Sequence, residues 1–331
     1  MTDFYLCPVD RLPLKAYRDG FECTSCGKRY GRKNGVLDFD VIQSDQREAF
    51  DGKFAGCKEL TAEEINTSLH LATGFLEHVG GSLDGKRVVD IGCGNGALTY
   101  GLFAHSTVKN SDIFCFDHSA KSMFVFLNSV AKLRTTNRLQ PSIQDVHRFA
   151  YPDNFFDAVF GCAILHHFLE FEAVLGQVYR SLKKGGVAIF AEPFAHGYLW
   201  AMFLLKLAAN GVPANSSGMG SFDIIVKNNF FLLDNYADRG KLAGFTDKFL
   251  FLEDELTNLS TDIGFLVRFA PFASQDYYNG FMLDILRTYN ISNHQVVDKA
   301  KKLYESLRLL IPQSLHRIVS HFKYIILRKP L

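Results

Sequence analysis

A buried β-strand that runs directly into a glycine-rich turn constrains this chain more than any other stretch. It covers Val88–Gly96, with the sequence VVDIGCGNG. Glycines at 92, 94 and 96 allow tight backbone turns with positive φ, and a helix predicted from Ala97 to Phe103 would offer its N-terminal N–H groups to a ligand. The stretch therefore predicts a ligand-binding strand–turn–helix unit in an α/β sheet.

The residues around this turn indicate the kind of ligand. The glycine spacing is G-x-G-x-G, which differs from the G-x-G-x-x-G of dinucleotide-binding proteins. Asp90 lies two residues before the first glycine, where its carboxylate would repel a pyrophosphate but could orient an ammonium group. Hydride transfer with a nicotinamide cofactor is therefore the second interpretation, and an ordinary strand-to-helix turn is the third.

Composition sets outer limits on partners and compartment. The chain has 331 residues, 47% of them hydrophobic, and a net charge of +1, which favours a sizeable core and argues against a globally basic nucleic-acid-binding surface. Its seven cysteines are mostly scattered, as in reduced cytoplasmic proteins. Met1–Cys7 shows no secretory signal, and no apolar run approaches the roughly 18 residues that span a bilayer. We expect a folded cytoplasmic protein with no membrane span.

Residues 1-42 contain two short cysteine-bearing segments, which together can bring four metal ligands to one place. They are Cys7-Pro8-Val9-Asp10 and Cys23-Thr24-Ser25-Cys26. Asp10 stands where a zinc ribbon would have a fourth cysteine; a carboxylate oxygen can ligate zinc, although three cysteines and one aspartate form an uncommon structural site. We expect a small zinc-ribbon-like domain whose candidate zinc ligands are Cys7, Asp10, Cys23 and Cys26. A metal-free domain held by its own core is the alternative.

Residues 43-82 have the apolar spacing of helices and form a helical lead-in. Thr61 is placed to cap one of these helices, with Glu64 at the third helical position completing a capping box. We expect these helices to cover the mouth of the ligand site. Turn signals at 80–81 and 84–85 then precede the central strand.

Further apolar strands follow the glycine turn at regular intervals. They are expected at Ile113–Phe116, Pro141–Gln144, Phe155–Cys162 and Val187–Glu192. Asp117 closes the second strand, where a carboxylate can hold both hydroxyls of a ribose. After the third strand, Asp145 could accept a hydrogen bond from an adenine amino group while Val146 lies on the ring.

The order of these parts resembles the class I S-adenosylmethionine-dependent methyltransferases over roughly Lys86 to Pro193. The segments that carry the resemblance are Val88–Gly96, Asp117, Gln144–Asp145, Phe156–Val159, His166–Phe168 and Arg180–Gly186. The resemblance implies an α/β fold, a Rossmann-like seven-stranded methyltransferase sheet with helices on both faces, occupying residues 83-331. Two antiparallel strands would close it, at Ile263–Phe269 and Tyr324–Lys329. The N-terminal segment resembles the zinc-ribbon-like tRNA-methyltransferase activators and the ribbons of certain ribosomal RNA guanine methyltransferases.

The resemblance also implies which residues hold the cofactor, S-adenosylmethionine. The glycine turn would hold its methionine end, Asp117 its ribose, and Asp145 with Val146 its adenine. The cofactor-site residues so implied are Asp90, Gly92, Gly94, Asn95, Gly96, Asp117, His118, Asp145, Val146 and Cys162. Small-residue packing is the alternative role of Cys162.

Methyl transfer needs acceptor and methyl group held in line more than it needs a strong base. If the acceptor is a hydroxyl, a side chain at the strand ends would help to remove its proton. The candidates are His166, His167, Glu192 and His196. For each of them a plainer role is open, namely capping a helix, bonding to backbone or facing solvent.

Two insertions interrupt the predicted methyltransferase domain, at about 194-248 and 270-321. We expect them to form a helical cap over the carboxyl ends of the strands, where ligands of open α/β sheets bind. Aromatic residues that could line an acceptor pocket there are Trp200, Phe203, Phe230, Phe231, Tyr277, Tyr278 and Phe281. Packing within the cap is the alternative for each, and a solvated face is the alternative for the basic segment 294–321.

These observations favour a methyltransferase that acts on a small-molecule or saccharide-type acceptor, with oxygen as the target atom. An RNA methyltransferase is the second hypothesis, because of the N-terminal ribbon. A non-catalytic cofactor-binding scaffold or activator is the third.

Overall fold

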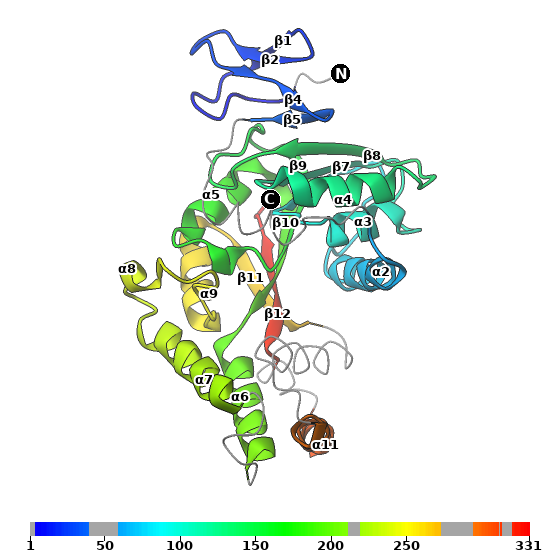
Figure 1. The fold of residues 1–331 in the computed structure, drawn as a ribbon. Coiled ribbons are helices and arrows are strands. Elements are labelled where there is room, and N and C mark those ends of the chain that lie inside the picture. The colour runs from blue at the N-terminus through cyan, green and yellow to red at the C-terminus, as the bar shows by residue number, and fades with distance from the viewer. Residues whose placement is uncertain (1–3, 40–58, 211–218, 273–293, 311, 313–319) are drawn as a thin grey trace.

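The computed structural model describes residues 4–39, 59–210, 219–272, 294–310, 312 and 320–331. The tyrosines at 277 and 278 and the phenylalanine at 281, which were expected in the acceptor pocket, lie outside these residues. Figure 1 shows a central twisted sheet with helices on both sides, a small β-rich segment at one end and a group of helices at the other. The predicted α/β class is confirmed.

A nine-stranded sheet organises the molecule, in the order β11-β12-β10-β9-β6-β7-β8-β5-β4. Its middle consists of five parallel strands. These are β6 (Arg87–Ile91), β7 (Asp112–Asp117), β8 (Arg138–Ile143), β9 (Phe156–Cys162) and β10 (Leu182–Pro193). The order reverses at β6, so β7 and β9 flank it on opposite sides and a ligand crevice is expected at its carboxyl end.

Two further strands close the sheet beyond β10. β12 (Phe322–Arg328) pairs antiparallel with β10, and β11 (Leu266–Pro271) pairs antiparallel with β12. Both agree with the closing strands expected from the sequence. Together with the five parallel strands they complete the predicted seven-stranded methyltransferase sheet.

The central strands β6, β7, β9 and β10 are buried on both faces, which explains why they are mostly apolar. Val88 and Ile113 point to one face and Val89 and Phe114 to the other, as the alternation of a strand requires. The first face is covered by α2 (Ala62–Leu76), α3 (Ala97–Ala104) and α4 (Ala120–Val130). The second is covered by α5 (Phe171–Ser181) and α9 (Glu253–Ile263), with the N-terminal segment beside them.

Helix α2 begins where its sequence signal placed it. Thr61 caps the helix through a hydrogen bond from the backbone N–H of Glu64, whose own side chain accepts from the backbone N–H of Thr61. The predicted capping box is therefore confirmed. The remainder of the expected helical lead-in before residue 59 lies outside the described residues.

The N-terminal segment is joined to the main sheet by backbone pairing. A small antiparallel sheet of β1 (Leu14–Tyr17), β2 (Gly20–Cys23) and β3 (Arg29–Tyr30) leads into a hairpin of β4 (Arg32–Lys33) and β5 (Val36–Asp38). β5 pairs in parallel with β8, with Leu37 opposite Ser142 and Asp38 opposite Ile143. The segment therefore covers one edge of the main sheet.

An aromatic cluster also links the N-terminal segment to the sheet. The ring of Tyr5 lies 5.6 Å from that of Tyr151 and 5.2 Å from that of Phe39, and Phe4 lies 5.2 Å from Phe114 of β7. Tyr5, Phe39 and Tyr151 are all buried. Both parts thus share one hydrophobic core.

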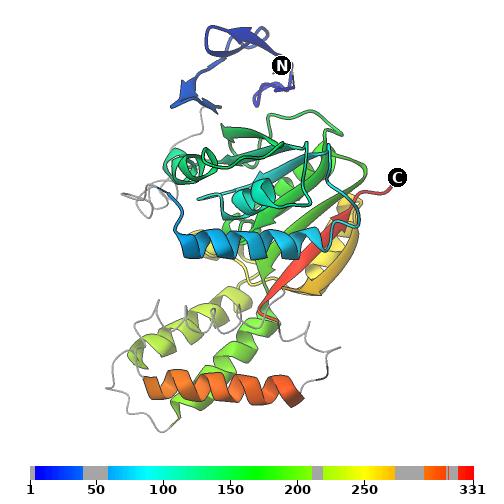
Figure 2. The same ribbon diagram turned by 90° about the vertical axis from the view of Figure 1, so that its right-hand side faces the viewer.

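The first insertion forms α6 (Ala195–Ala209), α7 (Met219–Asp234) and α8 (Arg239–Leu242), and the described part of the second forms α11 (His294–Leu310). In both views α6, α7 and α11 lie together beyond the carboxyl end of β10 (Figures 1 and 2). Four of the aromatic side chains expected to line a pocket are exposed here, namely Trp200, Phe203, Phe230 and Phe231. No described helix is long and apolar enough to cross a membrane.

Candidate active site

The glycine turn has the predicted left-handed backbone. Gly92, Gly94 and Gly96 have φ of 62°, 52° and 76°. A Cβ atom at Gly92 would lie 2.3 Å from Ile164, and one at Gly96 would lie 2.2 Å from Phe126, so any larger residue would clash at either position. At Gly94 no described atom lies within 4 Å of the Cβ position. The middle glycine thus leaves room for a ligand while its two neighbours allow close packing.

Asp117 lies against this turn, as expected for a residue that ends the neighbouring strand. Its Oδ2 accepts a hydrogen bond of 2.9 Å from the Gly94 N–H, and its Oδ1 accepts one of 2.8 Å from the Ser119 N–H. Nδ1 of His118 lies 3.4 Å from the same Oδ1. The carboxylate is therefore fixed at the rim of the turn, within reach of a ligand that rests on Gly94.

Asp90 is buried beneath the turn. Its Oδ2 accepts a 2.6 Å hydrogen bond from the Thr99 hydroxyl at the start of α3. Burial raises the pKa of Asp90 to about 7, against the stabilising Thr99 hydrogen bond and with the help of the nearby Asp117 charge. A cationic group bound near this carboxylate would favour its ionised form.

The other expected cofactor residues surround the same strand ends. Asp145 follows β8, where its Oδ1 accepts hydrogen bonds from the backbone N–H of His147 at 2.9 Å and lies 3.0 Å from the Nδ1 of that residue. Val146 is buried beside it. Asn95 is half-buried in the turn, and Cys162 is half-buried as the last residue of β9.

Glu192, near the end of β10, holds the loop that follows β9. Its fully buried carboxylate accepts hydrogen bonds through Oε1 from the backbone N–H of Ile164 at 2.9 Å and of Leu165 at 2.8 Å. Its Oε2 lies 2.7 Å from Nδ1 of His166, in the short helix η1 (Leu165–His167). Glu192 thus positions η1, and both oxygens of its carboxylate are already in contact with groups of that loop.

The pKa values of the two histidines of η1 are shifted in opposite directions. Burial lowers the pKa of His166, but the charge of Glu192 outweighs this and, with Asp247, raises it to about 9. Burial and the charge of His166 lower the pKa of His167 to about 4. At neutral pH His166 is therefore an imidazolium, which cannot act as a base, whereas His167 is neutral.

Asp247 completes this group, although the sequence pattern did not single it out. It lies on the segment that leads from the first insertion back to the sheet. The backbone of this segment is joined to η1 by a 2.8 Å hydrogen bond from the Lys248 N–H to the His166 carbonyl. Its Oδ1 lies 3.6 Å from Nε2 of His166 and 3.4 Å from Nδ1 of His167. Its position 80 residues after His167 in the chain carries no local signal, since only the tertiary fold brings the two together.

His196, the fourth catalytic candidate, is placed differently. It is exposed in the first turn of α6. Among the described residues, no hydrogen bond or ion pair joins it to His166, His167 or Glu192. The structure therefore groups three of the four catalytic candidates with Asp247 and leaves His196 apart.

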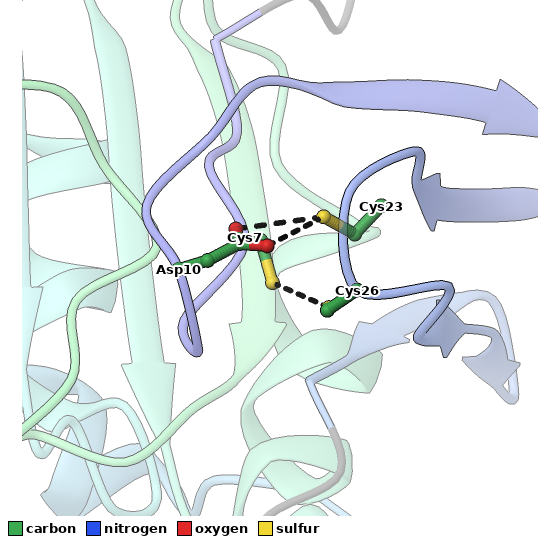
Figure 3. Close-up of side chains that lie close together, drawn as sticks. All are labelled: Cys7, Asp10, Cys23 and Cys26. Atoms are coloured by element: carbon green, nitrogen blue, oxygen red, sulfur yellow. Dashed lines mark hydrogen bonds between the residues drawn. The ribbon is translucent and has the colours of Figure 1, made fainter.

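The four candidate zinc ligands of the N-terminal segment come together, as Figure 3 shows. The Cys7 and Cys26 sulfurs lie 3.7 Å apart, and the Cys23 sulfur lies 3.2 Å from Oδ2 of Asp10. One donor atom from each residue lies within 4.8 Å of the others. The Tyr30 hydroxyl lies 3.2 Å from the Cys7 sulfur.

Known proteins resemble this chain in its central part. Residues 89–190 match the family described as "Methyltransferase domain". Sterol 24-C-methyltransferase ERG6A of Gibberella zeae is 28% identical over 138 residues, which make up 40% of this chain and 34% of that protein. The tRNA U34 carboxymethyltransferase of Campylobacter lari is 35% identical over 107 residues, 32% of this chain and 34% of that protein. The chain thus spans about a third of the length of these relatives.

A solved structure shares the fold more widely. Phosphoethanolamine N-methyltransferase 2 of Haemonchus contortus, in complex with S-adenosyl-L-methionine, matches with a TM-score of 0.50 and 16% identity, over 88% of this chain and 61% of that one. Strand order, glycine turn and family match agree that the fold is that of a class I S-adenosylmethionine-dependent methyltransferase.

Proposed function

We propose that this protein is an enzyme that transfers a methyl group from S-adenosylmethionine to a small-molecule or saccharide-type acceptor, at oxygen. The observation that carries the proposal is the hydrogen bond from the Gly94 N–H to Asp117, which fixes a carboxylate beside an open glycine turn. When bound, S-adenosylmethionine supplies an activated methyl group on its sulfonium. The chain then has to bind the cofactor, orient the acceptor and exclude water.

Each cofactor residue has a role that fits its position. Gly92, Gly94, Asn95 and Gly96 would face the methionine end, with Asp90 beneath them favouring its ammonium group. Asp117, beside His118, would accept hydrogen bonds from both ribose hydroxyls. Asp145 and Val146 would contact the adenine, with Cys162 closing the site from β9.

Replacing Asp117 tests the cofactor assignment directly. Asp117→Ala removes a charge-assisted hydrogen bond of roughly 1.5–3 kcal/mol, which corresponds to about 10- to 100-fold weaker binding of S-adenosylhomocysteine in calorimetry. Asp112→Ala is the matched control, because it removes a carboxylate from the other end of β7. Equal affinity in the two variants, or binding of NADH in place of the adenosyl ligand, would refute the assignment.

The titratable side chains at the carboxyl ends of β9 and β10 support a hydroxyl acceptor. Methylation of a hydroxyl releases a proton, and the neutral imidazole of His167, beside the carboxylate of Asp247, can accept it and pass it to solvent. His166 and Glu192 position these two groups. The sterol named for the ERG6A relative is a small molecule, while the tRNA named for the Campylobacter lari relative keeps RNA as the second candidate.

The class of acceptor can be identified from the cell fraction that receives a labelled methyl group. The purified protein would be incubated with methyl-labelled S-adenosylmethionine and a host-cell lysate, which is then separated into RNA, protein and small-molecule fractions. We expect label in the small-molecule fraction, insensitive to ribonuclease. Label in the RNA fraction would replace this proposal with the RNA methyltransferase. No label, with a stoichiometric protein partner on purification, would favour the scaffold.

We also propose that Cys7, Asp10, Cys23 and Cys26 hold a structural zinc ion. Zinc–sulfur bonds of about 2.3 Å in a tetrahedral site place two sulfurs roughly 3.8 Å apart. The Cys7–Cys26 separation of 3.7 Å fits that requirement, and three thiols with one carboxylate are donors that zinc accepts. Metal analysis should give one zinc per chain fewer in Cys23→Ser than in the parent or in Cys162→Ala. Equal zinc in both variants would exclude this site.

The insertions at 194-248 and 270-321 are proposed to cap the acceptor site on the methyltransferase domain of residues 83-331. The return segment at 246–251 supports this, because its Lys248 and Phe251 contact η1 and the residue after β10. Replacing residues 199–237 with a glycine-serine linker should abolish turnover and leave S-adenosylhomocysteine affinity within about twofold. A folded variant with parental turnover would exclude the cap.

A further inference from the structure

Donor atoms from two distant segments converge at the carboxyl ends of β9 and β10. His166 Nε2 and His167 Nδ1 lie 3.6 and 3.4 Å from Oδ1 of Asp247. The carbonyl oxygen of Thr246 lies 3.1 Å from the same Nδ1 of His167. One donor atom from each of the three side chains lies within 4.8 Å of the other two. In the absence of an ion, N–H protons of the two imidazole rings occupy these contacts, and a bound cation would take their place.

We propose that His166, His167 and Asp247 bind a divalent transition-metal cation, separate from the zinc site of the cysteines. Metal–nitrogen and metal–oxygen bonds of about 2.0–2.2 Å in a tetrahedral site place the ligands roughly 3.3–3.6 Å apart. The two spacings to Asp247, 3.6 and 3.4 Å, fall in this range.

The surroundings of His166 match those of histidines that ligate metals. Such a histidine donates its other ring N–H to a carboxylate or carbonyl, which fixes both the tautomer and the orientation of the ring. Nδ1 of His166 lies 2.7 Å from Oε2 of the buried Glu192. Glu192 is itself held by two backbone N–H groups through its other oxygen. Once the Nε2 proton of His166 is displaced by a cation, the lone pair left on that nitrogen is directed toward Asp247.

The donor set indicates which ions fit. Two imidazole nitrogens with a carboxylate oxygen suit Zn²⁺, Mn²⁺ or Fe²⁺, whereas Mg²⁺ and Ca²⁺ prefer oxygen ligands alone. A divalent charge would also balance the carboxylates of Asp247 and Glu192. In the absence of an ion the imidazolium of His166 is the cation that faces Asp247, so metal binding displaces its Nε2 proton. The Nζ of Lys248, the next residue in the chain, donates to the Phe245 carbonyl.

The place of the ion suggests its use, and this part of the inference rests on the proposed methyl transfer. Three protein ligands leave coordination positions for an acceptor hydroxyl, whose pKa a bound cation lowers. An oxygen lone pair of the acceptor would form the bond to the methyl carbon while the carbon–sulfur bond breaks and its electron pair stays on sulfur. With a cation bound, this activation replaces the base role given above to His167, which would act as a ligand, and the hydroxyl proton would pass to solvent.

Manganese titration tests the site in the full-length protein. The chain, first loaded with one equivalent of zinc to fill the cysteine site, would be titrated with Mn²⁺ while the free ion is followed by electron paramagnetic resonance. We expect one bound Mn²⁺ per chain, with affinity at least about tenfold weaker in Asp247→Asn. Asp238→Asn is the matched control, since it neutralises an exposed carboxylate of the same insertion. His167→Gln should match Asp247→Asn, and thermal unfolding shows that each variant is folded.

The outcomes separate this site from the cofactor assignment. Unchanged manganese affinity in folded Asp247→Asn or His167→Gln, or no bound manganese in the parent, overturns the metal site. In that case His166 bridges the two carboxylates as an ion pair. Binding of manganese without binding of S-adenosylhomocysteine would refute the methyltransferase proposal and leave the metal site standing.

Discussion

The N-terminal segment and the helices α6, α7 and α11 both extend the methyltransferase sheet, but they are attached in different ways. The N-terminal segment adds strands to β8 and buries Tyr5 and Phe39 in the core of the sheet. The helices lie beyond the end of β10 and leave Trp200 and Phe203 exposed. An addition that shares backbone pairing and core should be required for folding, whereas one that packs mainly on itself should be required only for function.

Removing residues 1–39 should have the largest effect. The deletion uncovers the edge of β8 and the aromatic rings of Tyr151 and Phe155, and an exposed edge strand promotes aggregation. We expect the truncated chain to be insoluble, or soluble without a cooperative thermal transition. A monomeric truncated chain that melts within a few degrees of the parent would show that the N-terminal segment is not required for folding.

A single truncation inside the shared core should act less strongly. Phe39 is 5% exposed and packs against Tyr5 and Tyr30. Phe39→Ala removes a buried ring and leaves a cavity, so we expect a loss of about 3–5 kcal/mol in the free energy of unfolding by urea denaturation. A loss below about 1 kcal/mol would show that the N-terminal segment is only loosely attached.

The pH dependence of stability that His321 causes reports on the packing between the helices and the sheet. It precedes β12, is buried beside Tyr198 of α6, and burial lowers its pKa from 6.5 to about 3. The unfolded chain therefore binds this proton below pH 6.5 while the folded chain does not, so stability is lost as pH falls from 6.5 toward 3. At pH 5 the loss should be roughly 2 kcal/mol.

The substitution His321→Phe isolates that contribution from other titrating groups. Urea denaturation at pH 7.5 and pH 5 should show a smaller drop in stability for the variant than for the parent, by the same amount. The same drop in both proteins would mean that the imidazole is hydrated, and that the helices part from the sheet in solution.

The smallest effect is expected on the outer face of α6. Phe203 is 54% exposed, so Phe203→Ala should change the free energy of unfolding by less than about 0.5 kcal/mol. This variant is the counterpart of Phe39→Ala, because the same side chain is removed from helix α6 instead of from the N-terminal segment. A loss comparable to that of Phe39→Ala would show that α6 is part of a core in solution.

Much of the methyltransferase fold could be predicted from the sequence. The apolar strands before Gly92 and Asp117 and the capping box at Thr61 are local signals, since residue type and spacing decide them within a few positions. The positions of Asp90 and Asp117 follow from the strands that carry them. The gathering of Cys7, Asp10, Cys23 and Cys26 was expected from their spacing, and the structure brings their donor atoms together.

The sequence by itself determined the class of fold, the glycine turn and the strands that carry the expected cofactor residues, because each depends on short-range pattern and backbone geometry. Only the tertiary structure decided that β5 joins β8, that Glu192 holds His166, and that Asp247 faces both histidines. Those pairs are far apart in the chain, and a contact between distant segments depends on how whole strands and insertions pack. No local pattern encodes such a contact, so the sequence could name His166 and Glu192 as candidates but could not place Asp247 beside them.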